Sequence, residues 1–353
     1  MKALILSGGK GSRLRPITHT SAKQLIPIAN KPILFYGLEA IRDAGIVDVG
    51  VIVGETGNEI KEALGNGSAW GLKLTYIEQE SPLGLAHAVK IARGYLKKEP
   101  FVMFLGDNLI KDGIVPFVEE FKKNKPNALV LLARVKNPQD FGVAQLKGGK
   151  VINLEEKPKK PKTNLALVGV YLFDHTIFEA IRHIKPSWRN ELEITDAISY
   201  LIHHGYEVHS HIINGWWKDT GKLEDLLEAN RIMLDTLQSQ VKGRVSKDSR
   251  LYGKVIIEKK ASIVHSVIRG PATIGENTRI ISSYIGPFTS VYHDAVIENS
   301  EIEHSIILEE SKIENIGRIE DSLIGKSVVV CRHPRKPQAY RFMLGDSSQV
   351  GII

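Results

Sequence analysis

The sequence has little cysteine and no long apolar segment. Cys331 is the only cysteine among 353 residues, so no disulfide can form within the chain. This usage is typical of proteins that stay in the reducing cytoplasm. No apolar run reaches the about 18 residues that a membrane-spanning helix needs, and the chain starts in a strand-like segment without the features of a signal peptide. We therefore predict a cytoplasmic protein with no membrane partner.

Clustered basic residues with accompanying aromatic side chains are also lacking. The formal net charge is +7, but aromatic residues make up only 7% of the chain and the lysines are scattered. The densest basic run, Lys157 to Lys162, is interrupted by prolines and contains no aromatic residue. A nucleic-acid-binding face usually gathers such residues together, whereas anionic phosphate substrates account for the positive charge without one. We predict no nucleic-acid partner.

The sequence does contain a glycine-rich segment near its start. An apolar run, Ala3 to Leu6, predicts a buried strand, and three glycines and three cations follow it: Gly8, Gly9, Gly11, Arg13, Arg15 and Lys23. Glycine lets a ligand approach the backbone, and converging N–H groups with nearby cations bind phosphate. The spacing fits neither the P-loop nor the dinucleotide fingerprint, because Leu14 stands where the latter needs its third glycine. The segment favours a phosphate-binding loop over a simple tight turn with solvated cations.

Apolar strands alternate with helical segments through the first 240 residues. This alternation, with strands that are apolar throughout, predicts an α/β fold with a Rossmann-like, mostly parallel sheet covered on both faces. In such sheets ligands bind at the carboxyl ends of the strands. We expect strands at 49–53, 73–77, 101–105 and 129–135, and helices at 58–64, 85–96 and 114–123.

Polar residues follow several of these strands. Asp107 comes directly after the strand at 101–105, and Asp219 lies far away, before a glycine and a helical segment. Two carboxylates that converge would suit Mg²⁺, which prefers a few carboxylates plus substrate phosphates; the alternative for each is a turn or helix cap. Gln79 offers a donor and an acceptor that match a pyrimidine edge, with Gly84 allowing close approach, although a turn before a helix explains the same pattern.

Charged residues in the middle of the chain could bind a sugar phosphate. Glu156 and Lys157, followed by a proline, could contact a hydroxyl and a phosphate together, or could form a solvated charge run. Arg189 is a further candidate for phosphate binding.

From about Gly243 the pattern changes to aliphatic residues every five or six positions. The repeat is unsuited to helices and predicts a β-solenoid, in preference to a set of hairpins. We place domain boundaries at residues 1–240 and 244–353. The repeating positions are Ile257, Ile263, Ile268, Ile274, Ile280, Ile285, Val291, Val296, Ile302, Ile307 and Ile313.

Ordered motifs across the first 235 residues carry a family resemblance. The chain resembles the sugar-phosphate nucleotidyltransferases, and among them the long-form glucose-1-phosphate thymidylyltransferases with a C-terminal left-handed parallel β-helix. Ser12 departs from the family's usual Thr and keeps the hydroxyl. The motifs are Gly8-Gly9-Lys10-Gly11-Ser12-Arg13-Leu14-Arg15-Pro16, Lys23-Gln24-Leu25-Ile26-Pro27, Glu78-Gln79, Gly106-Asp107-Asn108, Phe141-Gly142-Val143, Glu155-Glu156-Lys157-Pro158, Glu191-Leu192-Glu193-Ile194-Thr195-Asp196 and Lys218-Asp219-Thr220-Gly221.

The resemblance implies a role for each matching residue. Catalytic residues would be Arg13, Lys23 and Asp107. The nucleotide would contact Leu6, Gly8, Gly9, Gly11, Ser12, Arg13, Lys23, Gln79, Gly84 and Asp107. The sugar phosphate would contact Gly142, Glu156, Lys157, Val168 and Arg189. Mg²⁺, the expected cofactor, would bind Asp107 and Asp219.

The resemblance also implies a reaction and an assembly. Glucose 1-phosphate would attack the α-phosphate of dTTP, or of UTP, giving dTDP-glucose and pyrophosphate in the dTTP case. Related proteins form symmetric homo-oligomers, so we expect one here. Two alternatives stay open: a uridylyltransferase whose solenoid is an acyltransferase, and a non-catalytic regulatory subunit that keeps the fold.

Overall fold

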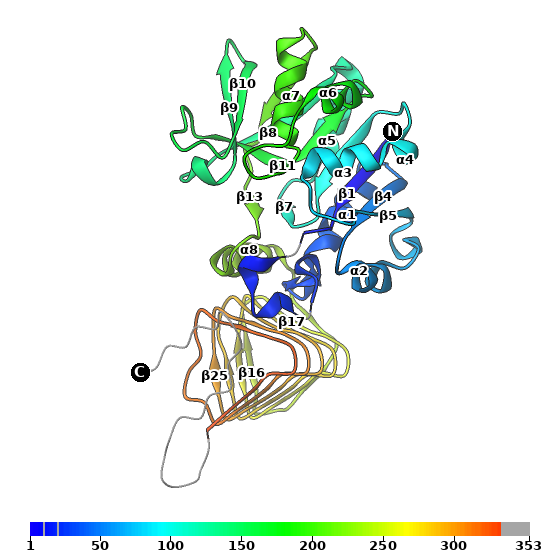
Figure 1. Cartoon of the computed structure of the whole chain (residues 1–353). Coiled ribbons are helices and arrows are strands. Elements are labelled where there is room, and N and C mark those ends of the chain that lie inside the picture. Colours follow the sequence, from blue (N-terminus) through cyan, green and yellow to red (C-terminus); the bar gives the residue numbers. More distant parts are fainter. Residues whose placement is uncertain (10, 20, 333–353) are drawn as a thin grey trace. The chain divides into compact units, whose positions relative to one another are not determined.

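The computed structural model describes residues 1–9, 11–19 and 21–332. Lys10 of the glycine-rich motif and the end of the predicted solenoid, 333–353, lie outside the described residues. The chain forms two compact units, Met1–Lys10 with Ile33–Asp219, and Gly11–Pro32 with Thr220–Ile353 (Figure 1). The second unit therefore includes a segment from near the start of the chain as well as the solenoid.

A nine-stranded mixed sheet forms the centre of the first unit. Strands β5, β4, β1 and β6 lie side by side and run parallel, as predicted, whereas β11 runs antiparallel between β6 and β8. The carboxyl ends of the four parallel strands therefore share one edge of the sheet. The strands are β1 (Lys2–Leu6), β4 (Asp48–Val53), β5 (Lys73–Glu78), β6 (Phe101–Leu105), β8 (Ala128–Arg134), β9 (Gly142–Lys147), β10 (Lys150–Glu156), β11 (Leu165–Phe173) and β12 (Val208–Ile212).

Helices pack on this sheet and enclose an aromatic core. Phe101 and Phe173 are fully buried on strands of the sheet, with ring centroids 5.7 Å apart. The predicted helix at 85–96 is two helices, which end and begin on either side of Ala92. The helices of this unit are α1 (Ile33–Asp43), α2 (Gly57–Leu64), α3 (Leu85–Ile91), α4 (Arg93–Leu96), α5 (Val115–Asn124), α6 (Ile177–His183) and α7 (Ile194–His203).

A small antiparallel ribbon completes the first unit. Its strands are β7 (Asn108–Ile110), which follows β6, and β13 (Trp217–Asp219), which ends the unit.

No helix in the described part of the chain has the length and apolar character needed to cross a membrane.

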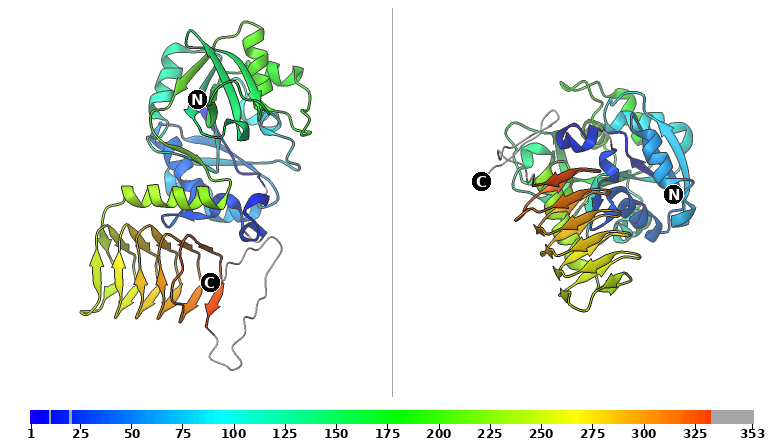
Figure 2. Two further views of the ribbon diagram at one scale, coloured as in Figure 1. Left: turned by 90° about the vertical axis from the view of Figure 1, so that its left-hand side faces the viewer. Right: turned by 90° about the horizontal axis from the view of Figure 1, so that it is seen from below.

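Three parallel sheets of short strands make up most of the second unit (Figure 2). This is the predicted left-handed parallel β-helix, whose rungs stack around an aliphatic interior. Helix α8 (Leu223–Thr236) lies beside these rungs and contacts β23. The sheets are, in order, β14 (Gln240–Val241), β17 (Val255–Ile257), β20 (Ala272–Ile274), β23 (Thr289–Val291), β26 (Ile306–Ile307) and β28 (Leu323–Ile324); β15 (Arg244–Val245), β18 (Ser262–Val264), β21 (Arg279–Ile281), β24 (Val296–Glu298), β27 (Lys312–Glu314) and β29 (Val329–Cys331); and β16 (Arg250–Tyr252), β19 (Val267–Arg269), β22 (Tyr284–Ile285) and β25 (Glu301–Ile302).

The interior positions agree with the predicted repeat except at one rung. Ile263, Ile280 and Ile297 are register partners in successive rungs and are fully buried. The prediction of Val296 as an interior residue was wrong, because Val296 is only partly buried. A repeat of five or six residues cannot choose between two adjacent aliphatic side chains, and the pleat of β24 decides in favour of Ile297.

A column of serines lines one corner of the β-helix. Ser283 Oγ donates to the Ile281 carbonyl at 2.7 Å and accepts from the Ser300 N–H of the next rung at 3.1 Å. Ser266 and Ser300 make the same pair of bonds. Each hydroxyl therefore satisfies a carbonyl within its own rung and an N–H of the following one.

We expect Ser283→Ala to destabilise the β-helix by about 1–3 kcal/mol, because it removes the acceptor of the buried Ser300 N–H, while the Ile281 carbonyl still accepts from the Asn299 N–H. Chemical denaturation monitored by circular dichroism would measure the loss. Ser327→Ala is the control, since Ser327 is exposed and bonds to the Glu310 carboxylate; it should cost under about 0.5 kcal/mol. Equal effects of the two substitutions would contradict the role of the column.

Candidate active site

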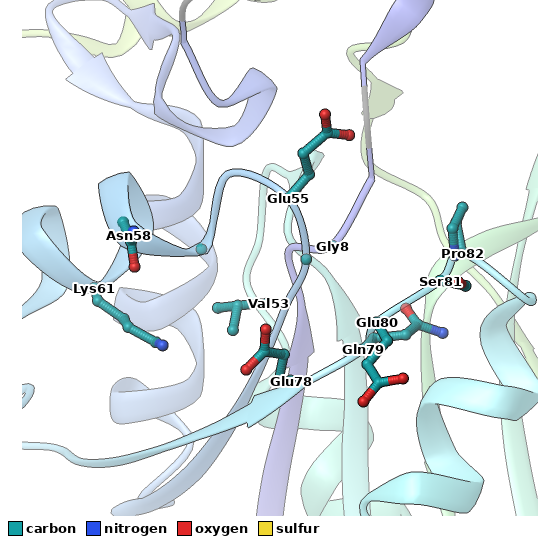
Figure 3. A pocket seen from close by; sticks show the side chains of 12 residues that line it. Gly8, Val53, Glu55, Asn58, Lys61, Glu78, Gln79, Glu80, Ser81 and Pro82 are labelled. Carbon is teal, nitrogen blue, oxygen red and sulfur yellow. The ribbon is translucent and has the colours of Figure 1, made fainter.

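A cavity of about 460 Å³ lies at the carboxyl ends of β1, β4 and β5 (Figure 3). Gly8, which follows β1, and Gln79, which follows β5, both line it, together with Asn58, Lys61 and Glu78. The structure thus brings together two of the residues expected to contact a nucleoside. Two others lie within two positions of Gly8: Leu6 is the last residue of β1 and is buried, and Gly9 is exposed.

The Gln79 side chain is held in place from two directions. Its Nε2 lies 3.0 Å from His87 Nδ1 and donates to the Gly84 carbonyl at 3.4 Å. Burial, with a smaller effect of Lys90, lowers the pKa of His87, which favours a neutral ring able to accept this bond. A Cβ on Gly8 would lie 3.3 Å from Gln79 Oε1, so the glycine leaves room for this side chain.

The fold gives Gly84 a structural reason to be a glycine, beside the nucleotide contact predicted for it. Its φ of 102° disfavours any other residue, and a Cβ there would lie 2.4 Å from the Leu192 carbonyl oxygen. The backbone on either side bonds to the same residue: Leu192 N–H donates to the Leu83 carbonyl at 2.8 Å and Ala86 N–H to the Leu192 carbonyl at 3.0 Å. Gly84 thus lets the loop after β5 join the loop before α7.

The ribbon of β7 and β13 brings the two predicted metal ligands close together. Asp219 is the register partner of Asn108, the residue after Asp107. Both aspartates are partly buried. Among the residues that the structure describes, no three His, Cys, Asp or Glu side chains form a metal-binding group. Two aspartates whose backbones are this close would suit Mg²⁺, which completes its coordination with substrate phosphates and water.

Asn108 fixes the geometry of this ribbon. It is 2% exposed, and its Oδ1 accepts from Trp217 Nε1 at 2.5 Å and from the Gly169 N–H at 3.2 Å. Because two donors determine which atom is the oxygen, its Nδ2 faces Asp107 and donates to Oδ1 at 2.9 Å. The sequence offered Asn108 only as part of a motif, and its function as a link between three strands depends on contacts distant in sequence.

The residues expected at the sugar phosphate lie mainly on the β9–β10 hairpin. Glu156 is the register partner of Gly142, and a Cβ on Gly142 would lie 3.1 Å from Glu156 Oε2. Lys157 follows with a φ of 42°, its N–H bonded to the Phe141 carbonyl. Val168 is buried in β11, where the pairing with β8 shifts register between Leu167 and Tyr171. The N–H of the next residue, Gly169, donates to Asn108.

Arg189 lies in a cluster of carboxylates. Its guanidinium is 3.5 Å from Glu156, 2.9 Å from Glu191 and 3.4 Å from Glu193. Burial raises the pKa of Glu156 and of Glu191, and the neighbouring Glu193 raises the pKa of Glu156 further. The Arg189 guanidinium acts in the opposite direction and offsets part of the cost of burying these carboxylates. These contacts involve Nη1 and Nη2, and a guanidinium has five N–H donors, so phosphate binding by Arg189 stays a prediction.

The remaining predicted residues belong to the second unit. Gly11 has a φ of 62°. A Cβ on Gly11 would lie 3.1 Å from Thr18 Cγ2 and 3.0 Å from Lys23 Cβ. Lys23 is 6% exposed, while Ser12 and Arg13 are exposed. The Arg13 guanidinium lies over Gly221, where a Cβ would come within 3.0 Å of Nη2.

Comparison with known proteins identifies the family. The nucleotidyl transferase family model matches residues 2–236. The chain is 53% identical to glucose-1-phosphate thymidylyltransferase of Streptomyces griseus and 54% identical to that of Streptomyces antibioticus, each over all of this chain and 99% of the relative. A solved Bacillus anthracis protein, named as a glucose-1-phosphate thymidylyltransferase and crystallised with a sucrose, covers 68% of this chain and 98% of its own at 37% identity and a TM-score of 0.64. The chain therefore belongs to the nucleotidyl transferase family.

Proposed function

We propose that this enzyme transfers a thymidylyl group from dTTP to glucose 1-phosphate, giving dTDP-glucose and pyrophosphate. The observation that carries the proposal is the pairing of β13 with β7, which makes Asp219 the register partner of Asn108, the residue after Asp107, at the sheet edge where the cavity lined by Gly8 and Gln79 also lies. The full-length similarity to two thymidylyltransferases supports the choice of substrates.

The reaction is a single displacement at phosphorus. An oxygen of the sugar phosphate forms a bond to the α-phosphorus, and the bond from that phosphorus to the bridging oxygen of pyrophosphate breaks. The attacking oxygen is already anionic, so no general base is required. Catalysis then depends on holding two anions together and neutralising the charge on the leaving group.

The residues divide this work. Gln79 binds the pyrimidine edge over Gly8, and Glu156 and Lys157 bind the hydroxyls and phosphate of the sugar. Arg13 and Lys23 neutralise the triphosphate and the departing pyrophosphate, roles that rest on the sequence resemblance. Asp107 and Asp219 would hold Mg²⁺, which supplies Lewis-acid stabilisation of charge on the transferring phosphate.

The experiment is pyrophosphate release with the purified full-length chain across a panel of nucleotides and sugar phosphates. We expect dTTP with glucose 1-phosphate to give the highest kcat/KM, with UTP lower by about tenfold, because one methyl group in a pocket contributes little discrimination. Mass spectrometry of the product identifies the nucleotide sugar. A preference for UTP would overturn the thymidylyl assignment, and no release with any pair would show a non-catalytic protein.

Two further assays address the remaining assignments. Incubation with acetyl-CoA and an amino-sugar phosphate would reveal acyl transfer by the β-helix, which we do not expect. Light scattering after size exclusion would test the proposed homo-oligomer.

A further inference from the structure

The segment Gly11–Pro32, called here the signature segment, has little regular structure of its own. Its described residues form three single 3₁₀ turns, Ser12–Leu14, Ile17–His19 and Lys23–Leu25, and a hairpin of two-residue strands, β2 (Pro27–Ile28) and β3 (Lys31–Pro32). Ordering such a segment is entropically costly, so its conformation has to be supported by contacts elsewhere. The contact pattern groups it with the β-helix unit.

A buried asparagine of α8 joins the signature segment to the β-helix. Asn230 is 0% exposed. Its Oδ1 accepts from the Ala29 N–H at 2.8 Å and from Ser290 Oγ at 2.6 Å, and its Nδ2 donates to the Phe288 carbonyl at 3.1 Å. One side chain thus bonds to the tip of the β2–β3 hairpin and to two residues of a single β-helix rung.

Two other contacts reach the β-helix from the same segment. Asn30 Nδ2 donates to the Val291 carbonyl at 2.8 Å. Ile17 packs against Gly325, where a Cβ would lie 3.1 Å from Ile17 Cδ1. Helix α8 and the β-helix strands that it accompanies are both visible in Figure 2.

The backbone at the hairpin tip needs this support. Ala29 and Asn30 both have positive φ values, 49° and 60°. Asparagine tolerates this region, but alanine rarely adopts it. The bond from Ala29 N–H to Asn230 holds the strained residue in place, as expected when surrounding structure over-determines a sparsely populated conformation.

We infer that Asn230 is a positioning residue through which the β-helix holds the signature segment, and with it Arg13 and Lys23, in the conformation that binds nucleotide. The inference rests on the proposed function, because it assigns the segment to dTTP. It gives the β-helix a function in the transferase reaction. Asn230 itself touches no substrate in this proposal.

The test compares three variants of the full-length protein. Asn230→Ala removes all three side-chain bonds, and Asn30→Gly removes one while keeping the positive φ accessible. Thr278→Val is the matched control: Thr278 is fully buried in the β-helix and donates to the Tyr292 carbonyl at 2.6 Å, without contact to the segment through that bond. For each we would measure melting temperature, KM and kcat, and amide hydrogen exchange of peptides covering residues 11–32.

We expect Asn230→Ala to raise the KM for dTTP by about tenfold, equivalent to about 1.4 kcal/mol of binding, and to speed exchange in 11–32, with the KM for glucose 1-phosphate changed less than about twofold. Asn30→Gly should act in the same direction and more weakly, and it decides the matter if Asn230→Ala does not fold. Thr278→Val should lower the melting temperature without these effects.

Two results would overturn the inference. One is an unchanged KM for dTTP in both Asn230→Ala and Asn30→Gly despite faster hydrogen exchange in residues 11–32. The other is a rise in the KM for dTTP in Thr278→Val as large as that in Asn230→Ala. Failure of the proposed function looks different, because the wild-type protein would then release no pyrophosphate from dTTP, and the exchange data would still report whether Asn230 orders the segment.

Discussion

Replacing Asp107 with asparagine is expected to lower kcat by about three orders of magnitude, or about 4 kcal/mol of transition-state stabilisation. The substitution removes one of two charges that would hold Mg²⁺, while the Asn108 Nδ2 can still donate to the oxygen of the new side chain. The fold should therefore survive. Pyrophosphate release under saturating substrates measures the loss, and circular dichroism with a melting curve checks the fold.

The companion variants separate metal binding from other effects. Asp219→Asn should lose a similar factor, and the double variant should be little worse than either single one, because both residues serve the same ion. Asp43→Asn, which alters an exposed carboxylate paired with Arg42, is the control and should retain full activity. Binding of Mn²⁺ followed by electron paramagnetic resonance gives a readout independent of turnover. Near-normal kcat in Asp107→Asn would refute the assignment.

Gly84→Ala is expected to cost about 3 kcal/mol of stability and to raise the KM for dTTP strongly. The added Cβ would meet the Leu192 carbonyl oxygen at 2.4 Å on a backbone with a φ of 102°, and both overpacking and strain of this kind cost about 1–3 kcal/mol. To relieve this clash, the loop after β5 has to move away from Leu192. That movement displaces the Gly84 carbonyl, to which the Gln79 side chain donates. Denaturation curves and dTTP titrations measure the two effects.

The chain offers a matched control for this substitution. Gly94 lies in the short helix α4, and a Cβ added there would have no neighbouring atom within 4 Å. Gly94→Ala should therefore leave activity unchanged and stabilise the protein by up to about 1 kcal/mol, since alanine is the better helix former. If Gly84→Ala behaved like Gly94→Ala, the contact with Leu192 would have no energetic importance.

Local patterns in the sequence were enough to predict the parallel strands and the polar residues at their ends. Gly8, Gln79 and Asp107 each come shortly after an apolar run, and in a parallel sheet such positions share an edge. The aliphatic repeat similarly predicted the β-helix, apart from the choice of Val296 over Ile297. These features depend on periodicity and chain direction, which are visible in one sequence.

Other features depend on contacts between distant residues, which periodicity cannot supply. Gly84 is a glycine because Leu192 lies against it. Arg189 carries a charge that suits phosphate, yet three carboxylates surround it in the folded chain. The grouping of the signature segment with the β-helix depends on hydrogen bonds such as that between Ala29 and Asn230, which are separated by 201 positions.

The β7–β13 ribbon has a consequence for how the molecule matures. Trp217 and Asn108 are 109 positions apart, so the ribbon closes a loop that contains a large part of the first unit. Closing so long a loop is favourable only after the intervening strands and helices have assembled. If Asp107 and Asp219 hold Mg²⁺ as we propose, a divalent ion is captured only by chains in which the first unit has assembled, so metal uptake would report that assembly and a newly made polypeptide would remain inert until then.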